Sequence, residues 1–161
     1  MKKDIYKCIA SGNYREAIGI LAEMAAEPGI IRITDPSTVA PLFAKYAGSK
    51  QEHFLVLTLD GAHQPIAVHE VTKGLTNRTI VHPREVFRVA LLDSAVSIIV
   101  AHNHPSGQLD PSSEDKELTM RLKDAAEVMG IALLDHIVVG IPRRHGTLSW
   151  TSMVELGILH P

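Results

Sequence analysis

The stretch AVSIIVAHNHPSGQLDPSSED, residues 95–115, joins an apolar run to a loop of small polar residues and then to the start of a helix. The apolar run is continuous and rich in β-branched residues, which predicts a strand buried on both faces. The helical pattern that follows extends from Ser112 to Met129 and is closed by Gly130. A buried strand followed by a strong helix favours an α/β fold, with a sheet covered by helices.

Two histidines stand at the end of this predicted strand. Residues two apart in a strand face the same side of the sheet, so His102 and His104 are placed to bind one metal ion. Zinc favours imidazole nitrogen together with a carboxylate, and a catalytic zinc keeps three protein ligands and one water. A third ligand must therefore come from another element.

The following helix offers a carboxylate at Asp115. The predicted apolar face of that helix consists of Leu118, Leu122, Ala125 and Met129. Asp115 heads the same stripe, where a carboxylate is out of place unless it turns toward the histidines at the end of the sheet. A structural alternative stays open, because Ser112 and Asp115 also fit a capping arrangement at the start of a helix.

The rest of the chain alternates between strand and helix patterns after Asp35. We expect strands over residues 52–60, 65–71, 131–140 and 147–150, with the turn DGAHQ closing a hairpin between the first two. We expect helices over residues 35–48, 83–93 and 151–157, with Val86, Val89 and Ala90 facing inward. Residues 1–30 are predicted to form a short helical extension, and residues 35–161 the main domain.

The composition bounds the class of protein. The chain has 161 residues, 45% of them hydrophobic, and a formal net charge of −2. These values indicate a globular protein and offer no general attraction to a polyanion. Cys8 is the only cysteine, which excludes an internal disulfide, a thiolate zinc cluster and the cysteine pair of zinc deaminases. No apolar run has the length of a signal-peptide core or a membrane span, so we expect a cytoplasmic protein without membrane contact.

The spacing of the four polar residues resembles a known metal motif. His102-x-His104, seven residues, Ser112, two residues and Asp115 are similar to the H-x-H-x(7)-S-x-x-D motif of the JAB/MPN-plus (JAMM) metalloproteases. Within that group, the blocks VHPREVFRVAL, AHNHPSG and LLDHIVVG resemble the RadC family, historically described as DNA-repair proteins. The similarity runs from about Asp35 to the C-terminus. It implies a JAB/MPN-like (cytidine deaminase-like) mixed sheet covered by helices, with zinc at the end of a central strand.

The resemblance also implies a role for each motif residue. His102, His104 and Asp115 become the ligands of Zn²⁺, and Ser112 the residue that supports an oxyanion. Zinc lowers the pKa of its water toward about 7, a glutamate takes the proton, and the hydroxide attacks a carbonyl. The implied reaction is the hydrolysis of a peptide or isopeptide bond.

No local sequence motif identifies the glutamate that would act as the general base. Glu52, at the start of the predicted 52–60 strand, has the separation from the histidines that suits the family; Glu70 and Glu85 are the other candidates. Asp135 and His136 are expected either to hydrogen-bond a ligand imidazole or to form a structural pair on a buried strand.

Two other functions stay open. A metal-dependent nuclease or other DNA-processing factor is disfavoured by the near-neutral charge. RadC proteins commonly carry an N-terminal helix-hairpin-helix domain, whereas the start of this chain shows no Gly-x-Gly hairpin and no cluster of lysines. A binding scaffold with a zinc site that never turns over is the third candidate. The expected partners are a peptide or protein substrate, with nucleic acid as the alternative and a homodimer as a compatible assembly.

Overall fold

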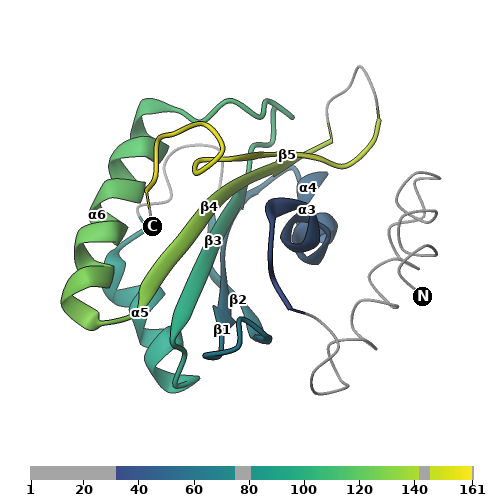
Figure 1. Ribbon diagram of the computed structural model, residues 1–161. Coiled ribbons are helices and arrows are strands. Elements are labelled where there is room, and N and C mark those ends of the chain that lie inside the picture. Colours follow the sequence, from purple (N-terminus) through teal and green to yellow (C-terminus); the bar gives the residue numbers. More distant parts are fainter. Residues whose placement is uncertain (1–31, 75–80, 142–145, 161) are drawn as a thin grey trace.

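The computed structural model describes residues 32–74, 81–141 and 146–160, so the helices expected within residues 1–30 lie outside the described residues (Figure 1). One sheet has the strand order β2-β1-β3-β4-β5. The strands are β1 Glu52–Leu59, β2 Pro65–Gly74, β3 Ser97–Asn103, β4 Ala132–Gly140 and β5 Ser149–Ser152. Strands β3 and β4 are parallel and the other neighbours antiparallel, so the predicted mixed α/β sheet is confirmed.

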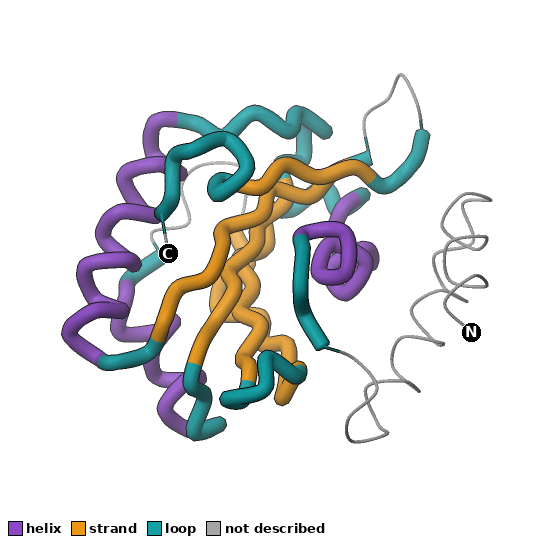
Figure 2. The backbone as a smooth tube through the Cα atoms, in the orientation of Figure 1, coloured by secondary structure: helices purple, strands orange, loops and turns teal. Residues whose placement is uncertain are grey.

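Helices cover both faces of this sheet (Figure 2). Helix α5, Pro83–Leu92, and helix α6, Ser113–Met129, lie on one face. The short helices α3 Pro36–Val39, η1 Ala40–Phe43 and α4 Ala44–Ala47 lie on the other. Two layers of core result, one on each side of the sheet.

The prediction of a doubly buried strand is confirmed at β3. Ile98 and Val100 belong to the core under α5 and α6, whereas Ile99 and Ala101 belong to the core under α3, η1 and α4. Every residue of the strand is buried. Each fully buried Val or Ile side chain contributes about 1.5–3 kcal/mol relative to exposure, so this strand anchors both layers.

The helix expected over residues 35–48 is broken into three short helices. Asp35 caps its start as the sequence predicts, accepting a hydrogen bond of 2.9 Å from the amide of Ser37. Pro41 then stands inside the segment, within the 3₁₀ turn η1. Proline lacks the N–H of the helical ladder and crowds the preceding turn, which accounts for the break.

The helix expected over residues 151–157 is not formed. Thr151 and Ser152 pair with β4 as the end of β5, and the chain then turns. The amide of Ile158 bonds to the carbonyl of Met153 at 2.8 Å, and Gly157 adopts a left-handed φ of 68°. The strand pairing leaves too few residues for a helix, and the buried Met153 closes the core instead.

The inward face of α6 agrees in part with the predicted stripe, because Leu122 is fully buried and Leu118 and Ala125 pack, partly buried, against the same core. Thr119, Leu122 and Ala126 are its buried residues, whereas Met129 is 39% exposed. On α5 the inward set likewise includes Phe87, with Val89 only partly buried. Asp115 still heads the buried line of α6, because Thr119 lies four residues after it.

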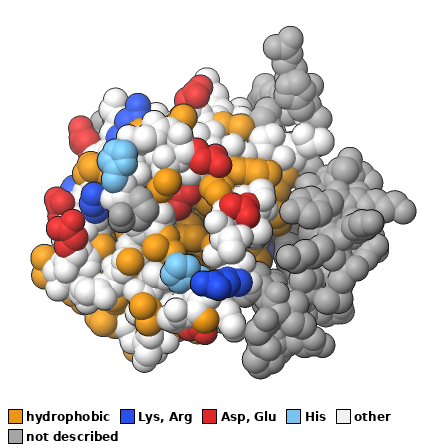
Figure 3. Space-filling model, viewed as in Figure 1, with side chains coloured by type: hydrophobic (Ala, Val, Ile, Leu, Met, Phe, Trp, Pro, Cys, Tyr) orange, Lys and Arg blue, Asp and Glu red, His pale blue; other side chains and the backbone are white. Residues whose placement is uncertain are grey.

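The surface of the described residues mixes both signs of charge. On the face in Figure 3, acidic and basic side chains are scattered among one another rather than gathered by sign. Within the described residues, no helix is both long and apolar enough to cross a bilayer.

Candidate metal centre

Three polar side chains meet at the end of the central strand. His102 lies on β3, His104 just beyond it, and Asp115 in the first turn of α6. The two Nε2 atoms are 3.0 Å apart, and the Asp115 carboxylate oxygens lie 3.2 Å from Nε2 of His102 and 3.3 Å from Nε2 of His104. Ligands about 2.05 Å from a tetrahedral zinc stand about 3.3 Å apart. The three groups lie close to that spacing, with Oδ1 of Asp115 against His102 and Oδ2 against His104. The sequence-predicted ligand set is brought together in space.

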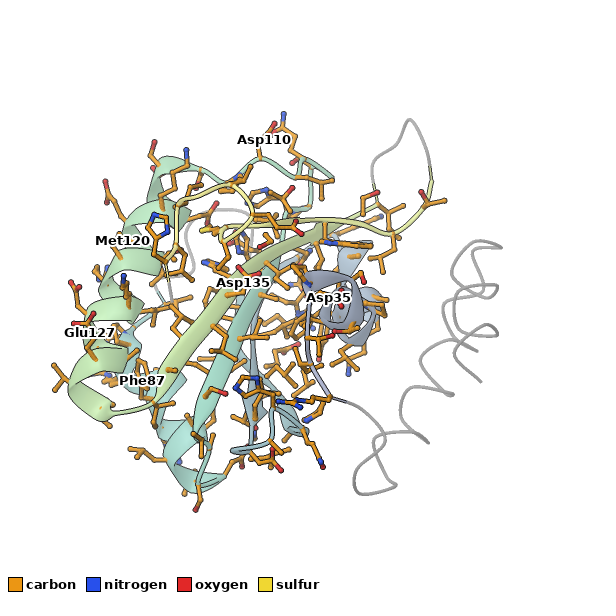
Figure 4. The ribbon with its side chains drawn as sticks, viewed as in Figure 1. Asp35, Phe87, Asp110, Met120, Glu127 and Asp135 are labelled. Carbon is orange, nitrogen blue, oxygen red and sulfur yellow. The ribbon has the colours of Figure 1, made fainter. Side chains whose placement is uncertain are left out.

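The loop between β3 and α6 sets the tautomer of His104. Its Nδ1 lies 3.0 Å from the backbone carbonyl oxygen of Gln108. A carbonyl only accepts, so Nδ1 carries the hydrogen and Nε2 keeps its lone pair toward the centre. This loop, in which Figure 4 labels Asp110, lies above the end of the sheet.

A chain of hydrogen bonds sets the tautomer of His102. Its Nδ1 lies 2.8 Å from Nε2 of His136, whose Nδ1 lies 2.6 Å from Oγ1 of Thr119. The Thr119 hydroxyl donates to the backbone carbonyl of Asp115 at 2.6 Å. With each N–H and O–H donating in this order, Nε2 of His102 carries no hydrogen and is free to bind a metal. The chain begins at one ligand and ends on the backbone of another.

His136 is neutral in this chain. Its ring is fully buried, and burial is the largest cause that holds its pKa well below the ordinary value. A neutral imidazole has one donor and one acceptor, which is what the chain requires. Of the two alternatives, His136 takes the hydrogen bond to the imidazole of His102, a candidate ligand.

Asp135 has the structural role that was the second of its two predicted roles. Its carboxylate accepts hydrogen bonds from the Ser152 hydroxyl at 2.6 Å and from the amides of His136 and Val154. Burial raises the pKa of this carboxyl group despite those bonds. Asp135 therefore ties β4 to β5 and the C-terminal turn, with none of these hydrogen bonds made to a metal-ligand imidazole.

A proton or a cation between His102, His104 and Asp115 would stabilise this arrangement of side chains. Burial raises the pKa of Asp115, but hydrogen bonds with His102 and His104 outweigh it and hold the pKa well below its usual range. The same contact with Asp115 is the largest cause that raises the pKa of His104. Two imidazole nitrogens and a carboxylate with contacts of 3.0–3.3 Å repel one another unless a proton or a cation lies among them. Two imidazole nitrogens and a carboxylate fit a zinc ion in that place.

The capping alternative is also present. Ser112 accepts a hydrogen bond from the amide of Asp115 at 3.1 Å, while the Asp115 carboxylate accepts from the amide of Ser112 at 2.7 Å. The Ser112 hydroxyl donates to the same carboxylate at 2.7 Å. The capping box therefore uses the same side chain as the candidate metal site, and it fixes the orientation of Asp115.

Glu52 lies on the same side of the sheet as the two histidines. In the antiparallel pairing of β1 with β3, Phe54 is opposite His102, and opposite residues share a face. Two residues back along β1 and two forward along the chain place Glu52 across from His104. The negative charge of Glu52 is one of the causes, after Asp115, that raise the pKa of His104.

The other two candidate glutamates have partners of their own. Glu70 lies 2.8 Å from Nδ1 of His53, which faces the opposite side of the sheet from Glu52. Glu85 forms an ion pair of 3.0 Å with the exposed Arg84. Of the three, Glu52 is the one whose charge acts on His104.

Sequence reasoning missed Thr119 and Gln108. Thr119 is fully buried and polar four residues after Asp115, a signal that was visible in the helical period. Gln108 acts through its backbone carbonyl, so its residue type carries no signal.

This sheet, with two imidazoles and a carboxylate at the end of its central strand, is consistent with a JAB-type domain that carries a candidate metal site. Residues 33–157 match the RadC family, described as a RadC-like JAB domain, and the chain belongs to that family.

Curated relatives support the same family. The chain is 48% identical over 115 residues to a UPF0758 protein of Methanospirillum hungatei, covering 70% of this chain and 51% of that protein. It is 44% identical over 128 residues to the UPF0758 protein SH1266 of Staphylococcus haemolyticus, covering 79% of this chain and 54% of that protein. The chain thus spans about half the length of these relatives.

Proposed function

We propose that this protein is a zinc-dependent hydrolase of peptide or isopeptide bonds, with His102, His104 and Asp115 as ligands and Glu52 as general base. The observation that carries the proposal is the convergence of two imidazoles and a carboxylate on one point at the end of β3. The position of Glu52 on the same face adds the proton acceptor that such a reaction needs.

The residues divide the work of hydrolysis. When bound, zinc supplies a Lewis acid that activates water near neutral pH and polarises the substrate carbonyl. Glu52 accepts one proton from the attacking water and delivers it to the leaving amine as the C–N bond breaks and the C–O bond forms. Ser112, whose hydroxyl now donates to Asp115, turns that donor toward the oxygen that develops negative charge. The products are an amine and a carboxylic acid, which releases the second proton of the water to solvent at neutral pH.

The surface supports an amide substrate better than a nucleic acid. The net charge is −2, and the face in Figure 3 interleaves acidic and basic side chains. Binding to a phosphate backbone rests on a concentrated group of Lys and Arg.

The test compares substrates with and without metal. The purified protein is loaded with one equivalent of Zn²⁺ and incubated with an unstructured fluorogenic peptide, a Lys-ε-linked isopeptide, and single- and double-stranded DNA. We expect amide cleavage that a chelator stops and Zn²⁺ restores, and none in His102→Ala. Chelator-sensitive DNA cleavage without amide cleavage would establish the nuclease instead, and zinc binding with neither would establish a binding scaffold.

A further inference from the structure

Asn103 lies between the two histidine ligands but faces the other side of the sheet. Neighbouring residues of a strand alternate in direction, so His102 and His104 point toward the metal centre and Asn103 points away. Its side chain is fully buried. A buried amide must find hydrogen-bond partners, and those partners show what the side chain does.

Among the described residues, this side chain forms its hydrogen bonds with the backbone around Glu52. Oδ1 accepts from the amide of His53 at 2.8 Å, and Nδ2 donates to the carbonyl of Gln51 at 3.0 Å. Nδ2 also lies 3.4 Å from the carbonyl of Ser49. One side chain thus holds a backbone group on each side of Glu52.

These contacts fix the direction of the Glu52 side chain. The Gln51 carbonyl belongs to the peptide unit before Glu52, and the His53 amide to the unit after it. The orientations of those two planar units define φ and ψ of Glu52. Holding both units therefore fixes where the Cα–Cβ bond of Glu52 points.

Glu52 pairs with Gly74 of β2, but no regular strand pairing holds it to β3, the strand that carries the histidines. The register of β1 with β3 begins at Phe54 opposite His102, so the pairing toward β3 stops short of Glu52. Beyond Phe54, the side-chain amide of Asn103 takes the place of the backbone hydrogen bonds that would join β1 to β3. On the same face, His53 bonds the Ser49 hydroxyl and Glu70, both at 2.8 Å, which holds this segment from a second direction.

We propose that Asn103 is the positioning residue for Glu52, linking the backbone of the general base rigidly to the strand that carries the metal ligands. The inference rests on the proposed function for the role of Glu52, and on the described geometry for the link itself. Misplacing a catalytic group by about 1 Å costs up to about 100-fold in rate, so such a link has a measurable consequence.

Kinetics of variants test the consequence. In Asn103→Ala we expect one equivalent of Zn²⁺ to bind with affinity within about threefold of wild type, kcat to fall by about tenfold or more, and KM to change by less than about twofold. In a Glu52→Gln background, Asn103→Ala should lower the residual kcat no further. Thr58→Val is the matched control, because it removes a buried hydrogen-bonding side chain from the opposite end of β1 and should leave kcat unchanged. An unchanged kcat in Asn103→Ala, a full additional loss in the Glu52→Gln background, or a loss of zinc binding would each overturn the inference.

A spectroscopic measurement separates this inference from the proposed function. The side-chain carboxyl ¹³C signal of Glu52, assigned by its absence in Glu52→Gln, should shift when Zn²⁺ is added to wild type. That shift should fall to less than about half in Asn103→Ala and stay in Thr58→Val. Asn103→Asp, which keeps the acceptor for His53 but loses both donors, should fall between them and provides a variant of native volume if Asn103→Ala does not fold. A shift that is equal in all variants refutes the positioning role, whether or not wild type cleaves an amide bond.

Discussion

Nδ1 of His102 lies 2.8 Å from Nε2 of His136, and the hydrogen bonds continue through Thr119 to the backbone of Asp115. This closed path joins β3, β4 and α6 around the metal centre. It leaves the lone pair of Nε2 of His102 directed at the point where a metal ion fits.

Thr119→Val should weaken zinc binding by about 10–100-fold. It removes the acceptor for the His136 N–H, so that His136 no longer fixes the tautomer in which Nε2 of His102 is unprotonated. Valine keeps the volume of threonine, so the packing of α6 changes little. Thr119→Ser retains the hydroxyl and should bind zinc within about threefold of wild type. Competition with a chromogenic chelator measures both affinities. Equal affinity in Thr119→Val and wild type would show that the hydrogen-bond path has no part in metal binding.

Asp115→Asn should reduce bound zinc to well below one equivalent, because it replaces the anionic ligand by a neutral amide of the same shape. Glu114→Gln is the matched control, since Glu114 is also an acidic residue of the first turn of α6 but is exposed. Glu114→Gln should keep one equivalent. Metal analysis after gel filtration provides the measurement, and full zinc in Asp115→Asn would remove Asp115 from the ligand set.

Glu52→Gln should keep zinc binding within about threefold and lower kcat by at least about 100-fold, because the glutamine amide accepts no proton from water. Glu85→Gln, which only breaks an exposed ion pair with Arg84, should keep the wild-type kcat. Zinc stoichiometry and amide hydrolysis are measured on the same samples. If Glu52→Gln turns over as wild type does, the general base is another residue.

Asp93→Asn should lower the free energy of unfolding by about 1–2 kcal/mol at pH 7. The Asp93 carboxylate accepts hydrogen bonds from Thr58 and His69, both at 2.6 Å. Burial raises its pKa, but these bonds outweigh burial and hold it below 3.8. A carboxyl group whose pKa is lower in the folded state stabilises above its ordinary pKa, and this contribution is lost as the pH falls through the lowered value.

The effect of Asp93→Asn should therefore shrink below about pH 4 and vanish in stronger acid. Urea unfolding at pH 7, 5 and 3 measures it. Asp124→Asn, at an exposed position of α6, should have little effect at any of these pH values. A cost of Asp93→Asn that is independent of pH would show that volume and packing, not the charge, account for it.

The parts of the fold that the sequence predicts well are those with strong local patterns. The continuous apolar run of β3 and the capped, glycine-closed α6 both follow from periodicity and end signals. The helix over residues 35–48 was predicted too simply, because Pro41 breaks the ladder that the apolar spacing suggests. The prediction of a helix over residues 151–157 was wrong, because pairing with β4, a long-range contact, outweighs local helix propensity.

The three candidate ligands were accessible to sequence reasoning because two of them stand at the end of one strand and the third follows after one loop. Periodicity alone then specifies which side chains share a face. The sequence gives no signal for the role of Asn103 beyond its position between two histidines. That role depends on a contact with His53, fifty residues earlier in the chain.

By itself, the sequence determined the α/β class, the buried strand and helix that carry the candidate centre, and the three candidate ligands that meet there. The tertiary structure alone decided that His136 and Thr119 orient His102. It also decided that Glu52 rather than Glu70 faces the centre. The hydrogen bonds of Asn103 to the backbone on both sides of Glu52 likewise appear only in the structure. The physical reason is the range of the interactions. Strand and helix periodicity act over a few residues, whereas hydrogen bonds between β1, β3, β4 and α6 depend on sheet register, which chain spacing does not encode.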